Sequence, residues 1–343
     1  MKTICLTGGG SAGHIMPNIA LLDELKIHFD KVVYIGTDGL EKEITKSYHI
    51  PFYQIDAVKL IRKLTLKNLL IPLKLRKSIT MAKEHLENIK PEVVFSKGGF
   101  VSLPVVIAAK KLNIPVISHE SDLTMGLANK IIYKYAKAVC TGFESTAEKF
   151  NKCVYTGSPI RKEIFLGQKS VAKKICGFND DKPVLLFFGG SLGSQKINNI
   201  VYQCIDNLSE YNIIHITGKS NKSHIHKQNY YSCEWTNNIE HFYALADIVI
   251  CRAGANAINE LLALNKKMIL IPLSKKQSRG DQIDNAKYFQ KKSYAKVIFE
   301  ENLTCEKLVN TIKNYPKKAF LGHDLKNSNK KIVDIILRYV NHS

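Results

Sequence analysis

Four glycines follow a short apolar run near the start of the chain, in TGGGSAGHIMPNIAL, residues 7–21. Glycine lets a backbone turn tightly and approach a ligand, and a helix that begins there directs its N–H groups at an anion such as phosphate. His14 lies at the start of that helix, where its ordinary pKa suits a general base. The spacing gives little support to a dinucleotide-binding GxGxxG motif or a P-loop. A packing turn and a structural histidine remain the alternatives.

A second glycine turn, GGSLGSQKIN at residues 189–198, also follows a strand-like run, and Ser191 with the neighbouring N–H groups forms another candidate anion site. Two such turns in matched positions imply a cleft between two domains. In CRAGANAINE, residues 251–260, a strand ends and a helix begins near Asn256, so its N-terminus can hold a diphosphate. Glu260 lies one turn later on the same face and can accept two ribose hydroxyls; a surface glutamate is the alternative.

Carboxylates and an amide gather in HESDLTMGLANK, residues 119–130. The segment follows a strand, so Glu120, Asp122 and Asn129 are expected at the carboxyl edge of a sheet, where α/β proteins bind ligands. A loop with helix-capping acids is the alternative.

Two further segments add weaker signals. SKGGFVSLP contains Gly98 and Gly99, which allow the backbone to approach an acceptor. RGDQIDNA carries Asp281 and Gln282 in a polar loop after a strand. Carboxylates and amides suit sugar hydroxyls, although most such loops are merely solvated.

Short β-branched runs alternate with helix-like stretches, which indicates βαβ units and parallel sheets. The expected strands are Thr3–Thr7, Lys31–Ile35, Val93–Ser96, Val116–His119, Ala138–Thr141, Val184–Gly189, Tyr211–Thr217, Ile248–Cys251 and Met268–Ile271. Each half opens with a strand, a glycine turn and a helix, so the sequence predicts an α/β fold of two Rossmann-like domains. We expect domains at 1–157 and 158–325, with a helix in 326–343 that packs back on the first.

Composition narrows the functional class. The chain has 343 residues and a formal net charge of +20, which attracts nucleic acid, anionic headgroups or phosphorylated substrates; a Lys-rich composition without specific meaning is the alternative. Eight cysteines without a CxxC pair indicate reduced thiols. Since neither a signal peptide nor a transmembrane-length apolar run is present, a cytosolic or peripheral protein is expected.

A basic and apolar segment, residues 58–79, contains seven Lys or Arg residues and no acid. Such a segment can lie in the headgroup region of an anionic leaflet, and a core helix with lysines on its wet face is the alternative. Aromatic residues are absent from it, which disfavours single-strand nucleic-acid binding. The candidate membrane residues are Lys63, Lys67, Leu69, Leu70 and Lys74.

Seven motifs occur in a fixed order across most of the chain: GGGSAGHIMPNIAL, SKGGFVSLP, HESDLTMGLANK, GSPIR, GGSLGSQKIN, CRAGANAINE and RGDQIDNA. Together they closely resemble the MurG family, the UDP-GlcNAc transferases that convert lipid I to lipid II in peptidoglycan synthesis. The set is highly specific, although no single motif is. The resemblance implies a GT-B fold, with a deep cleft between two Rossmann-like domains, the donor mainly on the second and the lipid acceptor on the first.

The resemblance also implies roles for residues. Glu260 would hold the ribose hydroxyls, and Gln282 would read the GlcNAc hydroxyls together with Asp122, where family members with HEQN carry Asn. The other donor contacts would come from Arg161, Ser191, the main chain near Thr236, Ala255 and Asn256. From the first domain, the donor would be approached by Ser11, Ala12 and Gly13. The acceptor and diphosphate loops would contain Gly10, Gly98, Gly99 and Asn129.

The reaction implied is inverting: the C4 hydroxyl of the acceptor attacks the anomeric carbon of the donor. His14 is the first candidate base and Glu120 the second, and the glycine turns would stabilise the leaving UDP. Because a D-x-D signature is absent from the sequence, we expect no protein-held metal and no tightly bound cofactor; UDP-GlcNAc is a substrate.

The expected partners are undecaprenyl-pyrophosphoryl-linked MurNAc-pentapeptide, an anionic membrane surface and other cell-wall or division proteins, with no nucleic acid. The expected location is peripheral, on the cytoplasmic face of the cell membrane. Two alternatives stay open: a GT-B transferase for another lipid acceptor such as a diacylglycerol, and a non-catalytic protein that binds nucleotide sugars at the membrane. A dinucleotide oxidoreductase fits the first turn poorly.

Overall fold

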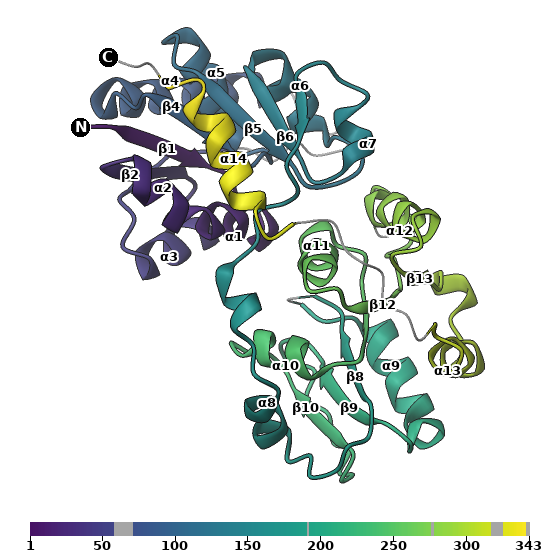
Figure 1. The fold of residues 1–343 in the computed structure, drawn as a ribbon. Helices are drawn as coiled ribbons and strands as arrows, with labels where there is room; N and C mark the ends of the chain where they lie inside the picture. The colour runs from purple at the N-terminus through teal and green to yellow at the C-terminus, as the bar shows by residue number, and fades with distance from the viewer. Residues whose placement is uncertain (58–70, 191, 276–277, 317–324, 341–343) are drawn as a thin grey trace. The chain divides into compact units, whose positions relative to one another are not determined.

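The computed structural model describes residues 1–57, 71–190, 192–275, 278–316 and 325–340. Its contacts divide the chain into two compact units (Figure 1): the first comprises Met1–Arg161 and Leu325–Ser343, and the second Lys162–Asp324. The sequence predicted the first boundary slightly earlier, after Gly157.

In the described part of the first unit, seven parallel strands form one sheet in the order β3-β2-β1-β4-β5-β6-β7. The strands are β1 (Thr3–Thr7), β2 (Lys31–Gly36), β3 (Phe52–Gln54), β4 (Val93–Ser96), β5 (Val116–Glu120), β6 (Ala138–Thr141) and β7 (Cys153–Tyr155). The helices are α1 (Ala12–Ala20), α2 (Leu22–His28), α3 (Leu40–Ser47), α4 (Ile71–Ile89), α5 (Ser102–Lys111), α6 (Leu127–Tyr135), α7 (Glu144–Ala147) and α14 (Ser328–Leu337).

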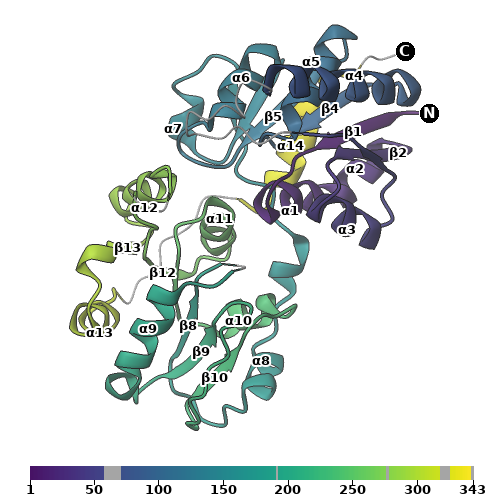
Figure 2. The same ribbon diagram turned by 180° about the vertical axis from the view of Figure 1, so that it is seen from behind.

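Alternation along the strands builds a core on each face of this sheet, because successive side chains point to opposite sides. Ile4 and Leu6 of β1 lie in the cluster that includes α1, α2 and α14. Cys5, between them, lies in the cluster that includes α4, α5 and α6. Figures 1 and 2 show the helices on the two faces. Since both faces are covered, the strands are continuous apolar runs.

The second unit repeats this arrangement. Its described strands are parallel and ordered β10-β9-β8-β11-β12-β13, the order of the first six strands of the first sheet. They are β8 (Val184–Phe188), β9 (Asn212–Ile216), β10 (Tyr230–Cys233), β11 (Ile248–Cys251), β12 (Lys267–Leu270) and β13 (Lys296–Val297). The helices are α8 (Lys169–Cys176), α9 (Gln195–Cys204), α10 (Ile239–Leu245), α11 (Ala255–Ala263), α12 (Asp281–Lys291) and α13 (Cys305–Lys313), with short 3-10 turns η2 (Lys162–Leu166), η3 (Ile205–Leu208) and η4 (Glu300–Asn302). The expected fold class, two Rossmann-like domains, is confirmed.

The last helix, α14, belongs to the first unit although the whole second unit precedes it. Ile332, Val333 and Ile336 are buried in one core cluster with Ile4 of β1 and Leu25 of α2. Asn329 fixes the entry to this helix, because its side-chain amide donates to Ala20 O and Ile160 O, each at 2.8 Å. The C-terminal helix therefore completes the core of the first sheet.

The expected strands all form, with ends that differ by at most one residue, but four strands were missed. These are β3, β7, β10 and β13, which are short and lie at or next to a sheet edge. Most residues of these edge strands are half-buried or exposed, so they form no apolar run like those of the buried strands and the sequence gives little signal for them. Across the described ranges, no helix is both long and apolar enough to cross a membrane.

We expect Ile336→Ala to lower the free energy of unfolding of the first unit by about 2–5 kcal/mol, because it deletes a fully buried side chain. Hydrogen exchange of peptides from β1 and β6, followed by mass spectrometry in denaturant, measures this loss. Trp235, the chain's one tryptophan, lies in the second unit, so its fluorescence transition should not move. Ile27→Ala, at a 69% exposed site on α2, is the matched control. An equal loss of stability in Ile336→Ala and Ile27→Ala would contradict the conclusion that α14 completes the first core.

Candidate active site

The first glycine turn connects β1 to α1 where the strand order of the sheet reverses, since β2 lies on one side of β1 and β4 on the other. Such switch points are the usual ligand sites of open α/β sheets. Gly10 has φ of +80° and Gly99, after β4, has φ of +82°. A Cβ on Gly99 would lie 2.9 Å from Gly9 O and 3.5 Å from His14 Cγ. The turns after β1 and β4 therefore touch, with His14 beside them.

Ser11 occupies the N-cap position of α1, yet its side chain makes no capping hydrogen bond to the helix backbone. Its Oγ instead lies 2.9 Å from His14 Nδ1. Ser11 and Gly13 are exposed, while Ala12 and His14 are half-buried. A hydroxyl that would ordinarily cap the helix is thus used to orient an imidazole.

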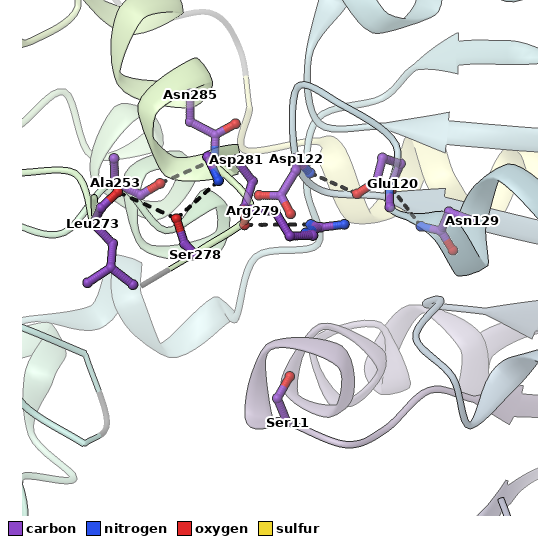
Figure 3. Close-up of polar contacts among 12 residues, drawn as sticks. Ser11, Glu120, Asp122, Asn129, Ala253, Leu273, Ser278, Arg279, Asp281 and Asn285 are labelled. Carbon is purple, nitrogen blue, oxygen red and sulfur yellow. Dashed lines mark hydrogen bonds and ion pairs between the residues drawn. The ribbon is translucent and has the colours of Figure 1, made fainter. Parts of the chain in front are cut away.

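Glu120, the last residue of β5, is 5% exposed, and its carboxylate holds the loop that follows it (Figure 3). Oε1 accepts from Asp122 N at 3.0 Å, and Oε2 accepts from Gly126 N at 3.1 Å and from Asn129 Nδ2 at 2.8 Å. A Cβ on Gly98 would lie 2.2 Å from Asn129 Oδ1. These residues lie together, as the sequence predicted, but the carboxylate of Glu120 is used to hold the loop after β5 in place.

Lys97 is a residue of this edge that the sequence reasoning missed. It follows β4 directly, is 2% exposed, and its ammonium donates to Ser121 Oγ. Burial lowers the pKa of Lys97 to about 8, although Glu120 and Asp122 act against that shift. A buried cation thus lies beside the two carboxylates of the loop. The available signal was its place directly after a buried strand and before Gly98.

The second glycine turn follows β8, which is the switch-point strand of the second sheet. Ser194 caps α9, accepting a hydrogen bond from Ile197 N at 3.4 Å. A Cβ on Gly193 would lie 2.1 Å from Thr217 O, and one on Gly218 would lie 2.3 Å from Gly193 Cα. This turn is again possible only without side chains. Ser191, predicted to contact the diphosphate, lies outside the described residues.

A buried ion pair ties this turn to the neighbouring strands. Arg252, directly after β11, has its Nη2 2.6 Å from Glu300 Oε1 and 2.7 Å from Ser194 Oγ, and Nη1 donates to Ile271 O at 3.0 Å. Glu300 Oε2 in turn accepts from Ser274 N at 3.2 Å. Removing one partner of such a pair typically costs 3–5 kcal/mol, because the other charge stays buried. The sequence reasoning gave neither residue a role.

A cavity of about 440 Å³ lies at this edge of the second sheet. Gln282, at the start of α12, is in its wall and accepts from Leu273 N through Oε1 at 3.0 Å, which leaves its amide N–H groups as donors. Nearby, Asn285 Nδ2 donates to Ala253 O at 3.2 Å and Ser278 Oγ to Leu273 O at 3.5 Å, which fixes the loop before α12 (Figure 3). The cavity is lined by Gly189, Gly190, Leu192, Gly193, Ser194, Gln195, Lys196, Arg252, Leu273 and Gln282.

The remaining predicted donor residues are less concentrated. Helix α11 begins at Ala255, one residue before the predicted Asn256, with Gly254 as its N-cap. Glu260 is half-buried, and Tyr243 donates to its Oε2 at 3.5 Å. Thr236 lies in the β10–α10 loop, where its Oγ1 accepts from Asn238 N at 2.8 Å. Arg161 is the last residue of the first unit's long segment.

The predicted membrane residues fall mostly outside the described ranges, namely Lys63, Lys67, Leu69 and Leu70. Lys74 is described, and it is exposed on α4.

All eight cysteines are free thiols, of which Cys5, Cys140, Cys204 and Cys251 are buried. Within the part of the chain that the structure describes, no group of three or more His, Cys, Asp or Glu side chains could hold a metal ion.

A buried histidine is linked to the second glycine turn through Asn198. His215 Nε2 lies 3.0 Å from Asn198 Oδ1, and Asn198 Nδ2 donates to Thr217 O at 2.9 Å, at the crossing with Gly193. His215 Nδ1 lies 2.9 Å from Tyr230 Oη. Because the amide accepts at Oδ1, Nε2 carries the hydrogen, and Nδ1 faces the Tyr230 hydroxyl, so both ring nitrogens have a partner when the imidazole is neutral. Burial lowers its pKa to about 4.

Comparison with known proteins agrees with both halves of this description. Residues 4–141 match the glycosyltransferase family 28 N-terminal domain, and residues 184–336 match the glycosyltransferase family 28 C-terminal domain. Two Rossmann-like units with these domain types define a glycosyltransferase of the GT-B fold.

The chain belongs to the family of UDP-N-acetylglucosamine–N-acetylmuramyl-(pentapeptide) pyrophosphoryl-undecaprenol N-acetylglucosamine transferases, the MurG family. It is 48% identical to the Clostridium tetani protein of that name, over 98% of each chain. It is 46% identical to the protein of Clostridium botulinum strain Hall, over 99% of each.

Solved structures share the fold at lower identity. Acinetobacter baumannii MurG superposes with a TM-score of 0.72 at 24% identity, over 100% of this chain and 96% of that one. A calicheamicin glycosyltransferase superposes with a TM-score of 0.71 at 13% identity, over 100% and 99%. At these identities the likeness concerns the fold alone.

The His215 network predicts acid sensitivity in the second unit. Folding lowers the pKa of His215 from 6.5 to about 4. The stabilisation that its neutral form gives to the folded state is therefore complete above about pH 6.5 and is lost as the pH falls toward 4. The loss amounts to about 3 kcal/mol. Denaturant unfolding followed by Trp235 fluorescence between pH 7.5 and pH 4.5 measures it. In His215→Gln this part of the pH dependence should disappear; an unchanged slope would remove His215 as its source.

Proposed function

We propose that this chain transfers GlcNAc from UDP-GlcNAc to the C4 hydroxyl of MurNAc in undecaprenyl-pyrophosphoryl-MurNAc-pentapeptide, converting lipid I to lipid II in peptidoglycan synthesis. Nearly full-length similarity to transferases named for this donor and acceptor supports it. The observation that carries the donor side is the cavity of the second unit, where a glycine turn, a buried guanidinium and an amide meet.

On the donor side, the backbone N–H groups of the described turn residues 189–190 and 192–194, and the N-terminus of α11, suit the two negative charges of the diphosphate. Arg252 lines the same wall, where Glu300 balances its charge and holds the guanidinium in place. The N–H groups of Gln282 would bind a GlcNAc hydroxyl, and Glu260 would hold the ribose. Ser11, Ala12, Gly13, Asp122, Arg161, Ser191, Thr236, Ala255 and Asn256 keep the donor roles proposed for them from the family resemblance.

On the acceptor side, we assign the base to His14 and not to Glu120. Both oxygens of Glu120 already accept hydrogen bonds, three in all, and its carboxylate is nearly buried. His14 is half-buried beside the touching turns. When Nδ1 carries a hydrogen and donates to Ser11 Oγ, Nε2 is the ring nitrogen with the lone pair that can take a proton.

The step then balances without a further reactant. The C4 hydroxyl gives its proton to His14 Nε2 while its oxygen forms the bond to the anomeric carbon. The bond between that carbon and the diphosphate breaks, and UDP leaves with the electron pair. Attack from the face opposite UDP inverts the configuration, so an α-linked donor gives a β-linked product.

For the acceptor lipid, we propose that the basic segment at 58–79, which includes the first half of α4, forms a peripheral contact with the anionic cytoplasmic face of the cell membrane. Leu73 is 65% exposed at the start of α4, and Lys74 and Arg76 are exposed within one turn of it. Lys77 is also exposed but pairs with Asp56 at 2.9 Å. An apolar side chain among basic ones is the pattern of an interfacial helix.

The first experiment is UDP release with a lipid I analogue, comparing UDP-GlcNAc, UDP-GalNAc and UDP-glucose. Fast release that requires both the analogue and UDP-GlcNAc supports the donor, acceptor and reaction class together. Donor binding without release from the lipid I analogue would sink the proposed acceptor. A diacylglycerol acceptor would then distinguish another transferase from a non-catalytic binding protein.

His14→Ala should lower kcat by roughly 10²–10⁴-fold, the usual contribution of a general base, with little effect on the KM for UDP-GlcNAc. Steady-state UDP release at saturating acceptor measures both constants. Ser11→Ala should lower kcat less, because the imidazole stays but loses its orienting partner. A near-wild-type kcat in His14→Ala would return the base to Glu120.

Replacing Lys74 and Arg76 together by Glu should weaken binding to vesicles containing anionic lipid, with each lost cation costing about 1 kcal/mol, roughly fivefold. Vesicle co-sedimentation at low and moderate salt measures the effect. Replacing Lys287 and Lys307 together by Glu, at exposed sites on α12 and α13, is the control that makes the same change of charge. If the double variant and the control bind alike, α4 is not the membrane contact.

A further inference from the structure

Glu41 stands at the start of α3, beyond the end of β2, in a sequence that none of the seven motifs includes. It is 2% exposed, which is unusual for a carboxylate because leaving water costs several kcal/mol. Its Oε1 accepts from Gly10 N and from Thr37 Oγ1, each at 3.0 Å. One of its two hydrogen bonds is therefore to the first glycine turn.

The turn is also shaped around this carboxylate. A Cβ on Gly9 would lie 1.8 Å from Glu41 Oε1, and one on Gly39 would lie 3.3 Å from Oε2. Gly10 itself is left-handed, with φ of +80°. The side chain of Glu41 thus fills the space that Gly9 leaves empty and fixes the direction in which the N–H of Gly10 points.

The N–H of Gly10 is one residue away from Ser11, whose hydroxyl pairs with the imidazole of His14. Gly10 precedes Ser11, whose Oγ lies 2.9 Å from His14 Nδ1. A shift of the turn moves Ser11 and with it the imidazole. Glu41 reaches the turn from α3, the helix that follows the neighbouring strand β2, and its hydrogen bond to Gly10 N opposes such a shift.

We propose that Glu41 is a positioning residue for glycosyl transfer: its carboxylate holds the first glycine turn, and thereby the Ser11–His14 pair, in the geometry that removes the acceptor proton. The inference rests on the proposed function. It assigns to Glu41 a geometric role through the Gly10 hydrogen bond, and no contact with either substrate.

Two substitutions of Glu41 distinguish the length of its side chain, which the hydrogen bond to Gly10 N requires, from its negative charge. Glu41→Gln keeps an oxygen that can accept from Gly10 N but loses the charge, so it should retain kcat within about threefold. Glu41→Asp keeps the charge but is too short to reach, so kcat should fall by about 10–100-fold, as for a misplaced catalytic group. In Glu41→Asp the KM for UDP-GlcNAc should rise by a smaller factor than kcat falls, because Ser11, Ala12 and Gly13 are the only proposed donor contacts on this turn and the donor cavity belongs to the other unit.

The opposite pattern, with Asp active and Gln inactive, would overturn the positioning role in favour of a requirement for charge. A rise in the KM for UDP-GlcNAc larger than the fall in kcat would also overturn it. Glu43→Ala, on the exposed side of the same helix turn, is the matched control and should behave as wild type.

Hydrogen exchange of the peptide that contains Gly10, measured without substrates, tests the hold on the turn separately from the reaction. Exchange should speed up in Glu41→Asp and stay slow in Glu41→Gln; equal protection in both would overturn the inference. If wild-type protein does not transfer GlcNAc, the proposed function fails while this readout still reports on Glu41. Circular dichroism confirms that each variant compared is folded.

Discussion

The site depends on backbone segments that come closer than side chains would allow. In the first unit, a Cβ on Gly99 would lie only 2.9 Å from Gly9 O, so the turns after β1 and β4 approach this closely because residue 99 lacks a side chain. In the second unit, Gly193 and Gly218 make a comparable crossing between the turns after β8 and β9, and a Cβ on either would collide with the other segment. Each crossing lies at the switch point of its sheet, where parallel strands present their carboxyl ends. The ligand sites follow from this constraint, because only bare backbone leaves N–H groups within reach of a phosphate or a sugar.

Bare backbone is also easily displaced, and buried charged side chains hold it in place. Glu41 and Glu120 fix the first turn and the loop after β5 through main-chain N–H groups. Lys97 and Arg252 stand directly after β4 and β11, the strands that neighbour the two switch-point strands, and each bonds to a serine of an adjacent turn. Burying such groups is costly, and a satisfied network is tolerated where it fixes one arrangement. In both units, therefore, a buried cation directly after the strand next to the switch-point strand holds an adjacent turn in place, with lysine in the first unit and arginine in the second.

The sequence predicted the layers because buried parallel strands are long apolar runs and glycine turns follow two of them. It also placed Glu120, Asp122 and Asn129 together, since their segment follows a strand and so lies at the carboxyl edge of the sheet. It missed Glu41, because a glutamate in a helix reads as solvated surface until the sheet places β2 beside β1. It missed Arg252 and Glu300 for a similar reason: their pairing joins segments almost fifty residues apart, and no local pattern records that contact. The role of Glu120 as an anchor became visible only with its three hydrogen-bond donors in place.

The return of α14 to the first sheet has a consequence for how the molecule is made. Ribosomal synthesis delivers β1 to β7 first, then the entire second unit, and only then Ile332, Val333 and Ile336, which the first core requires. The half that is translated first is therefore the half that is completed last, and its apolar face stays partly open while the rest of the chain emerges. During that interval the nascent first sheet is the part most exposed to misassociation and to chaperone capture. Order of synthesis and order of completion are reversed in this protein by a single helix.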